Sequence, residues 1–299
     1  MSKFLTFTLL FALSLSGISQ DLKHNQNLIA KGATVTKVGS GYTFTEGPSV
    51  APDGRVFFTD QPNDKIDVWS EKGNTITTFM QPCERSNGTY FNKKGELVAC
   101  ADLHNRLVAI SMDKQMRTLV ENFNGQPLNA PNDLWIAPNG GIYFTDPYYA
   151  RDYWEKGRKE VQDKRGVYYL NPEGKVIRVI EDYKQPNGLI GTPDGKTLYV
   201  SDINDSKIWK YTINADGTLS NKTFFAPEGS DGMTIDNKGN VYLSNKYVSV
   251  FDKGGKKIAE IEVPQMPSNV CFGGKSRNVL FITARTAVYT LKMKVKGVN

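Results

Sequence analysis

The 299-residue sequence contains little histidine and cysteine. It has two histidines, His24 and His104, and three cysteines, Cys83, Cys100 and Cys271. These are too few for most zinc sites and for a disulfide framework, so we expect any metal to be held by oxygen atoms. Cys83 and Cys100 could form a single disulfide, or the cysteines could be buried as small apolar side chains.

Long runs of one charge sign are also absent. The 37 basic and 31 acidic residues are scattered along the chain and give a formal charge of +6, which argues against a dedicated nucleic-acid binder. The hydrophobic share of 39% excludes a disordered or collagen-like chain. Length and composition therefore predict a globular protein of one large or two ordinary domains.

The most apolar stretch lies at the N-terminus and is short. Lys3 precedes the apolar run Phe4 to Leu15, and small residues follow it. This order predicts a signal peptide over residues 1–19 and a periplasmic or secreted protein that is free of the membrane after cleavage. A membrane anchor is the alternative, but about twelve apolar residues are fewer than the roughly twenty that span a bilayer.

A pattern of short strands recurs six times along the chain. Each repeat has a polar start, runs of β-branched and aromatic residues, and turns rich in Gly, Asp, Asn and Pro. The repeats start at Glu46-Gly47, Asn87-Gly88, Asn132-Asp133, Asn187-Gly188, Asp231-Gly232 and Ser268-Asn269. Repeats of about 40 to 55 residues with four strands each predict an all-β fold, a six-bladed β-propeller with four-stranded blades.

The sixth repeat has too little chain for a fourth strand after Leu291, whereas the strand-like segment Ala33 to Val38 precedes the first repeat. We expect this N-terminal segment to pair in the last blade and close the ring, because that removes a free sheet edge. The domains are then the signal peptide, an extension over 20–32 and one propeller over 33–299. A flat sandwich is the alternative, but it does not explain the regular spacing.

The common register brings oxygen-bearing side chains to one end of the central channel, because the second strand of each blade returns antiparallel to the start of the first. The first ring comprises Glu46, Asn87, Asn132, Asn187, Asp231 and Asn269, and the second comprises Asp60, Asp102, Asp146, Asp202 and Asn245. These ligands suit one hard divalent cation, with Ca²⁺ preferred and Mg²⁺, Zn²⁺ and Mn²⁺ left open. Alternatively, they are turn residues that bond to the backbone.

Further polar and aromatic groups are expected near this channel mouth. His104 follows the second strand of repeat two, and Arg85 lies close to Asn87, so both are candidates for substrate binding. An exposed loop histidine and a surface ion pair of Arg85 with Glu84 are the alternatives. The insertion Pro147 to Arg165 is rich in Tyr, Trp and basic residues and predicts a lid that packs on a ligand, with a plain surface loop as the alternative.

Six motifs, in order and at propeller spacing, resemble the SMP-30/gluconolactonase/LRE-like family, which includes gluconolactonases and regucalcin, from about residue 42 to 291. The motifs are Thr45-Glu46-Gly47-Pro48, Pro131-Asn132-Asp133, Tyr143-Phe144-Thr145-Asp146-Pro147, Pro186-Asn187-Gly188, Ser230-Asp231-Gly232-Met233 and Asn269-Val270-Cys271-Phe272-Gly273-Gly274. The resemblance implies a six-bladed propeller with one divalent metal in the channel, held by Glu46, Asn187 and Asp231.

The resemblance also implies roles for two other residues. Asn132 would bind the metal or contact a sugar lactone, and Asp146 would donate a proton. Regucalcin-type members carry an Arg where this chain has Ala130. Arg85, His104 or basic residues of the insertion would then take over the substrate contact of that Arg.

Together these residues lead to the hypothesis of a metal-dependent lactonase acting on a sugar lactone. The cation would polarise the lactone carbonyl, and Asp231 or Asp146 would transfer a proton. A serine mechanism is not indicated, because the sequence has no Gly-x-Ser-x-Gly motif. A phosphotriesterase-like hydrolase and a non-catalytic calcium- or sugar-binding propeller are the alternatives, since the same ring would serve each of them.

Overall fold

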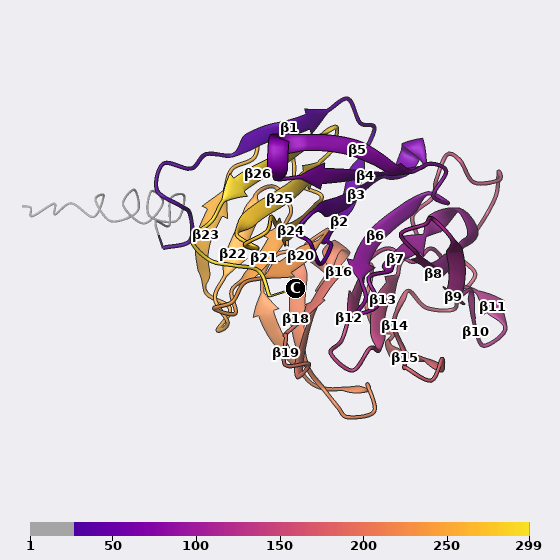
Figure 1. Ribbon diagram of the computed structural model, residues 1–299. Coiled ribbons are helices and arrows are strands. Elements are labelled where there is room, and N and C mark those ends of the chain that lie inside the picture. Colours follow the sequence, from indigo (N-terminus) through magenta and orange to yellow (C-terminus); the bar gives the residue numbers. More distant parts are fainter. Residues whose placement is uncertain (1–26, 299) are drawn as a thin grey trace, which may run out of the picture.

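The computed structural model describes residues 27–298, and the predicted signal peptide over 1–19 lies outside the described residues. Six antiparallel four-stranded sheets follow one another along the chain (Figure 1). The strands of the first three sheets are β2 (Thr45–Val50), β3 (Val56–Asp60), β4 (Lys65–Ser70) and β5 (Thr75–Met80); β6 (Ser86–Phe91), β7 (Leu97–Ala101), β8 (Arg106–Ile110) and β9 (Met116–Val120); and β12 (Leu134–Ile136), β13 (Ile142–Asp146), β14 (Gly166–Leu170) and β15 (Val176–Ile180). Those of the last three are β16 (Pro186–Gly191), β17 (Thr197–Asp202), β18 (Lys207–Ile213) and β19 (Leu219–Ala226); β20 (Met233–Ile235), β21 (Val241–Ser244), β22 (Val248–Phe251) and β23 (Lys257–Ile261); and β24 (Asn269–Gly273), β25 (Val279–Ala284), β26 (Ala287–Lys292) and β1 (Thr36–Ser40).

The innermost strands form a closed ring around a central channel. β2 contacts β6, and the contacts continue through β12, β16, β20 and β24 back to β2. A separate hairpin of β10 (Asn122–Phe123) and β11 (Gln126–Pro127) was not predicted. The predicted six-bladed propeller with four-stranded blades is therefore confirmed.

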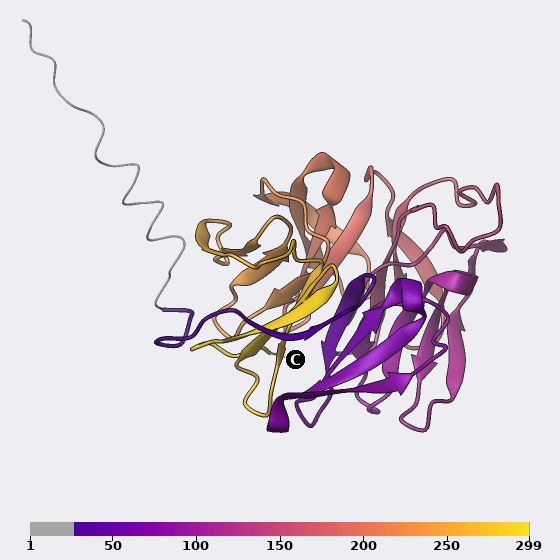
Figure 2. The ribbon, with the colours of Figure 1, turned by 90° about the horizontal axis from the view of Figure 1, so that it is seen from above.

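The ring is closed by the N-terminal segment, as predicted. β1 pairs antiparallel with β26, so that Thr36 lies opposite Thr290, and the indigo strand lies beside the yellow C-terminal strands (Figures 1 and 2). The strand begins three residues later than the predicted segment Ala33 to Val38. Leu28 is also buried against the sixth blade, so apolar packing continues ahead of β1.

Aromatic and β-branched residues of the middle strands fill the space between adjacent sheets. Phe57 of β3 packs edge-on against Phe79 of its own blade and Phe91 of the next blade, with ring centroids 5.0 Å apart in each pair. The three cysteines are unpaired and buried in these apolar clusters. Burial, rather than a disulfide between Cys83 and Cys100, is thus the explanation that holds.

The helical segments of the described chain are short 3₁₀ turns at strand ends. They are η1 (Gln61–Asn63), η2 (Lys72–Asn74), η3 (Asp102–His104) and η4 (Ile203–Asp205). Within residues 27–298, no helix has the length and apolar character needed to cross a membrane.

Bulges and glycines shape the channel mouth. The pairing of β2 with β3 shifts register between Glu46 and Ser49, and equivalent shifts occur at the starts of β6 and β16. Such bulges redirect the side chains next to them. Gly47 has φ 50°, and a methyl group there would overlap the carbonyl oxygen of Asn87 on the adjacent blade. The glycine of the repeat start therefore allows neighbouring blades to approach closely around the channel.

Candidate functional site

Three of the predicted metal ligands come together at the channel mouth. Glu46 lies in β2, Asn187 in β16 and Asp231 just before β20. Asn187 Nδ2 donates a hydrogen bond to Asp231 Oδ1 at 2.8 Å. Glu46 Oε2 accepts hydrogen bonds from Gly47 N at 2.8 Å and from Asn269 Nδ2 at 3.1 Å. The site thus combines two carboxylates with the side-chain amides of Asn187 and Asn269 and the backbone N–H of Gly47.

The two carboxyl groups perturb each other. Burial raises the pKa of Glu46 well above its usual value, and the charge of Asp231 raises it further. Burial also raises the pKa of Asp231, whereas side-chain hydrogen bonds with Asn187 and Glu46 lower it. Two buried like charges disfavour joint ionisation, and a bound cation would reverse that effect.

An unpartnered oxygen supports a cation in this place. Asn187 is 2% exposed, and its Oδ1 has no hydrogen-bond partner among residues 27–298. A buried polar atom without a partner is costly, and an amide oxygen beside two carboxylates is a suitable ligand for Ca²⁺ or Mg²⁺. No cluster of three or more His, Cys, Asp or Glu residues in the described chain could hold a metal, so a cation here depends on Asn187 as well as on Glu46 and Asp231.

The predicted first ring needs a correction at the sixth blade. The backbone N–H groups of Asn132, Asp231 and Ser268 each donate to a carbonyl on the neighbouring second strand, so these three positions are equivalent. Asn269 is one residue further along and was misplaced in the predicted ring. Its side chain still reaches the site because its amide bonds to Glu46.

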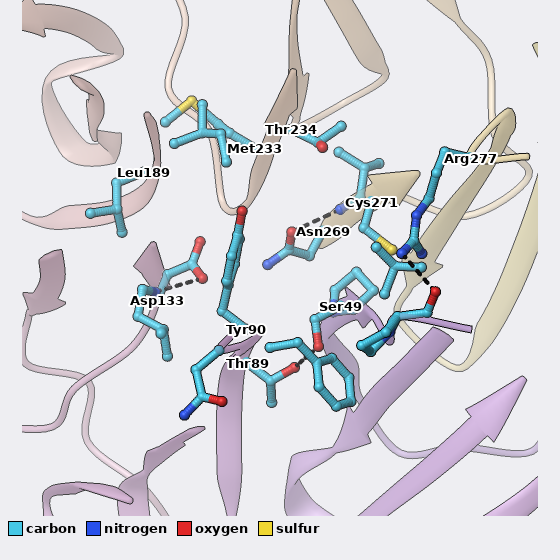
Figure 3. A pocket seen from close by; sticks show the side chains of 18 of the residues that line it. Ser49, Thr89, Tyr90, Asp133, Leu189, Met233, Thr234, Asn269, Cys271 and Arg277 are labelled. Carbon is cyan, nitrogen blue, oxygen red and sulfur yellow. Dashed lines mark hydrogen bonds between the residues drawn. The ribbon is translucent and has the colours of Figure 1, made fainter. Parts of the chain in front are cut away.

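Asp133 is a channel residue that the sequence argument did not single out. Its carboxyl is buried, and burial, with a smaller contribution from Asp231, raises its pKa to about 7. Asp133 and Asn269 border a cavity of about 290 Å³ that continues along the inner strands, where Tyr90, Leu189 and Met233 line it (Figure 3). The polar ring is therefore followed along the channel by a largely apolar space.

The carboxylate of Asp146, the predicted proton donor, binds two backbone N–H groups. Its two oxygens accept hydrogen bonds from the N–H groups of Asn129 at 2.9 Å and Ala130 at 2.8 Å. Burial raises the pKa of Asp146 to about 7. Asn132, a predicted ligand and substrate contact, lies two residues after this anchored segment and is itself buried.

The two substrate-binding candidates of repeat two, His104 and Arg85, lie in different surroundings. His104 is exposed at the end of η3. Arg85 donates to the carbonyl of Pro62, and its guanidinium lies 4.6 Å from the ring centre of Tyr153 in the insertion. The alternative ion pair of Arg85 with Glu84 is wrong, because Glu84 pairs with Arg106.

The insertion between β13 and β14 reaches the site. Asp102 Oδ2 on blade two accepts hydrogen bonds from Arg151 Nε at 2.8 Å and Tyr153 Oη at 2.6 Å. The Arg151 guanidinium lies 5.3 Å from the ring centre of Tyr149, whose hydroxyl accepts a hydrogen bond from Asn187 Nδ2. The length and aromatic content of the insertion signalled a lid, but nothing in the pattern indicated which residue meets the ring.

Comparisons with known proteins agree with the propeller fold. A family model described as the SMP-30/Gluconolactonase/LRE-like region matches residues 44–286. A gluconolactonase of Zymomonas mobilis is 27% identical, with 95% of this chain and 92% of that protein aligned. The solved structure of a gluconolactonase from Xanthomonas campestris has a TM-score of 0.84 at 27% identity and covers 90% of this chain and 92% of its own. The calcium-binding protein regucalcin from Agrobacterium tumefaciens shares the fold, with a TM-score of 0.74 at 18% identity over 89% of this chain and 95% of its own.

Proposed function

This chain belongs to the SMP-30/gluconolactonase/LRE-like family, and from that premise we propose that it is a lactonase that hydrolyses a sugar lactone. Proteins named gluconolactonases align over nearly its whole length and support this reaction. The observation that carries the proposal is the unpartnered Oδ1 of Asn187 beside the carboxylates of Glu46 and Asp231. A family likeness alone would not indicate a working site.

We assign a divalent cation to Glu46, Asn187 and Asp231, with Asn132 as a further ligand or as a contact to the substrate. When bound, the cation would polarise the lactone carbonyl. The ligands are all oxygen atoms, which favours Ca²⁺. Elemental analysis of protein purified without added metal identifies the ion.

Proton transfer is assigned to Asp231 rather than to Asp146. Asn187 holds Asp231 Oδ1, and Oδ2 would take a proton from the attacking water. The water oxygen bonds to the carbonyl carbon, the ring C–O bond breaks, and Asp231 returns the proton to the departing alkoxide, so that the product is a hydroxy acid. Asp146 has both oxygens bonded to backbone N–H groups, and we assign it to anchoring the segment before Asn132.

The test of this function is the release of acid from a panel of sugar lactones, measured with and without EDTA. We expect turnover that EDTA abolishes and Ca²⁺ restores. Asp231→Asn should lower kcat by about 100-fold or more, because general acid–base catalysis contributes about 10²–10⁴. Asp205→Asn is the control, since Asp205 pairs with Lys184 and Lys207 outside the channel. Turnover of phosphotriesters alone, or binding of lactones without hydrolysis, would refute the lactonase assignment.

For the N-terminus we propose that residues 1–19 are a cleaved signal peptide, so that the enzyme acts in the periplasm or outside the cell. The proposal depends on the charged, apolar and small-residue order of the sequence. N-terminal sequencing of protein recovered from an exporting host should give a chain that starts near Gln20. Recovery of an intact Met1 terminus would contradict it.

A further inference from the structure

The Asn187 side-chain amide is held from two sides. Its Nδ2 donates to Asp231 Oδ1 at 2.8 Å and to the Tyr149 hydroxyl at 2.9 Å. A primary amide has two N–H donors, so these two acceptors use both of them. The amide oxygen is left as the free end of a fixed group, and it has no partner among the described residues.

The two acceptors have different effects on the amide. The Asp231 carboxylate orients the NH₂ end of the Asn187 amide toward itself, because it would repel the amide oxygen. One hydrogen bond still allows the amide plane to tilt about the contact. The second bond, to Tyr149, fixes the plane and with it the direction of Oδ1.

Tyr149 does not belong to the blade that carries Asn187. It lies in the insertion between β13 and β14, and its ring packs against Arg151, which Asp102 of blade two holds at 2.8 Å. The Tyr149 hydroxyl thus brings the insertion into direct contact with the Asn187 amide.

We propose that Tyr149 is a positioning residue that sets the Asn187 amide so that Oδ1 faces the cation. The inference rests on the proposed cation site and adds to it a specific role for the insertion. The insertion then contributes to metal affinity through one hydroxyl group.

The matched pair of variants is Tyr149→Phe and Tyr148→Phe. Both remove one hydroxyl from the same insertion, but the Tyr148 hydroxyl donates to the carbonyl of Arg158 and not to Asn187. Calorimetric titration of each EDTA-treated protein with CaCl₂ should show about tenfold weaker binding for Tyr149→Phe. Tyr148→Phe should bind as the wild type does. Equal Kd values for Tyr149→Phe and the wild type, or equal weakening in both variants, would overturn the proposal.

A second measurement does not depend on the cation. The side-chain NH₂ signal of Asn187, identified by its loss in Asn187→Ser, should exchange slowly with solvent in the metal-free wild type and in Tyr148→Phe. In Tyr149→Phe one of its two hydrogens loses its acceptor, so its exchange should be about tenfold faster. Unchanged exchange would overturn the positioning role, whereas a wild type that binds none of Ca²⁺, Mg²⁺, Mn²⁺ and Zn²⁺ would refute the proposed cation site itself.

Discussion

The aspartates that end the second strands share one task at the residue scale. Asp60, Asp146 and Asp202 each accept hydrogen bonds from two consecutive backbone N–H groups just ahead of the inner strand of their own blade. Ahead of the inner strand of blade two, Cys83 N and Arg85 N instead donate to Asp64 of blade one. Asp102 is thereby free to bind Arg151 and Tyr153 of the insertion. Because Asp64 binds these backbone groups in blade two, Asp102 instead anchors the insertion.

The raised pKa of Asp146 predicts a pH dependence of stability. The carboxyl is protonated more readily in the folded chain, with a pKa of about 7, than in the unfolded chain, where the ordinary value is 3.8. The folded state therefore binds more protons between about pH 4 and 7, and the free energy of unfolding falls as pH rises through that window, by at most about 1.4 kcal/mol per pH unit for one group.

Asp146→Asn should flatten this part of the curve, measured by urea unfolding from pH 4.5 to 8 in the presence of EDTA. Parallel curves for the variant and the wild type would contradict the prediction. The same variant should keep kcat within about tenfold if Asp146 anchors backbone. A loss of 100-fold or more would return the proton-donor role to Asp146.

At the scale of elements, the insertion over 147–165 is a loop held by polar contacts along its length. It packs internally through Trp154, which is 9% exposed and lies 5.9 Å from Tyr148 between ring centres. Its first half is tied to Asp102 through Arg151 and Tyr153, and its second half is tied to Asn129 through the backbone N–H groups of residues 161 and 162. A long loop without strands of its own opens more easily than the sheets beside it.

Asp102→Asn should therefore loosen the insertion without unfolding the propeller. Hydrogen bonds to a charged group contribute about 1.5–3 kcal/mol each, so trypsin should cleave the basic residues of the insertion at least about tenfold faster. Asp205→Asn, which breaks a surface ion pair elsewhere, should leave the rate unchanged. An equal rate for Asp102→Asn and the wild type would show that the insertion is held by other contacts.

For the whole molecule, closure of the ring depends on a tight seam between the first and last blades. β1 joins the sixth sheet, and a Cβ at Gly39 would lie 2.6 Å from Cδ1 of Ile76 on blade one and 3.0 Å from Cγ2 of Val288 on blade six. A larger residue at Gly39 has to displace these side chains at the seam between the two blades. Such overpacking costs about 1–3 kcal/mol.

Gly39→Val should lower Tm by about 2–10 °C through this clash. Ser40→Val, an exposed position on the same strand, is the control and should leave Tm nearly unchanged. Thermal unfolding followed by circular dichroism measures both. A Gly39→Val protein as stable as Ser40→Val would mean that the seam relaxes at little cost.

The sequence by itself determined the blade number, the ring closure and the convergence of Glu46, Asn187 and Asp231. Strand alternation and turn residues are local patterns that the sequence shows directly, and their recurrence in one register gives the number of blades and the equivalent positions in each blade. The same logic misplaced Asn269 by one residue, because the sixth repeat starts with two adjacent polar residues, Ser268 and Asn269, and the pattern does not show which of them takes the equivalent position.

Only the tertiary structure decided which neighbours each polar group meets. The contacts of Asp102 with Arg151 and of Asn187 with Tyr149 join residues 38 to 49 positions apart that belong to different blades or to the insertion. No local periodicity encodes such a pairing, because it depends on how an irregular loop folds back over the ring. The repeat pattern therefore determined the ring of oxygen-bearing side chains, and packing between blades determined how each of these side chains is held.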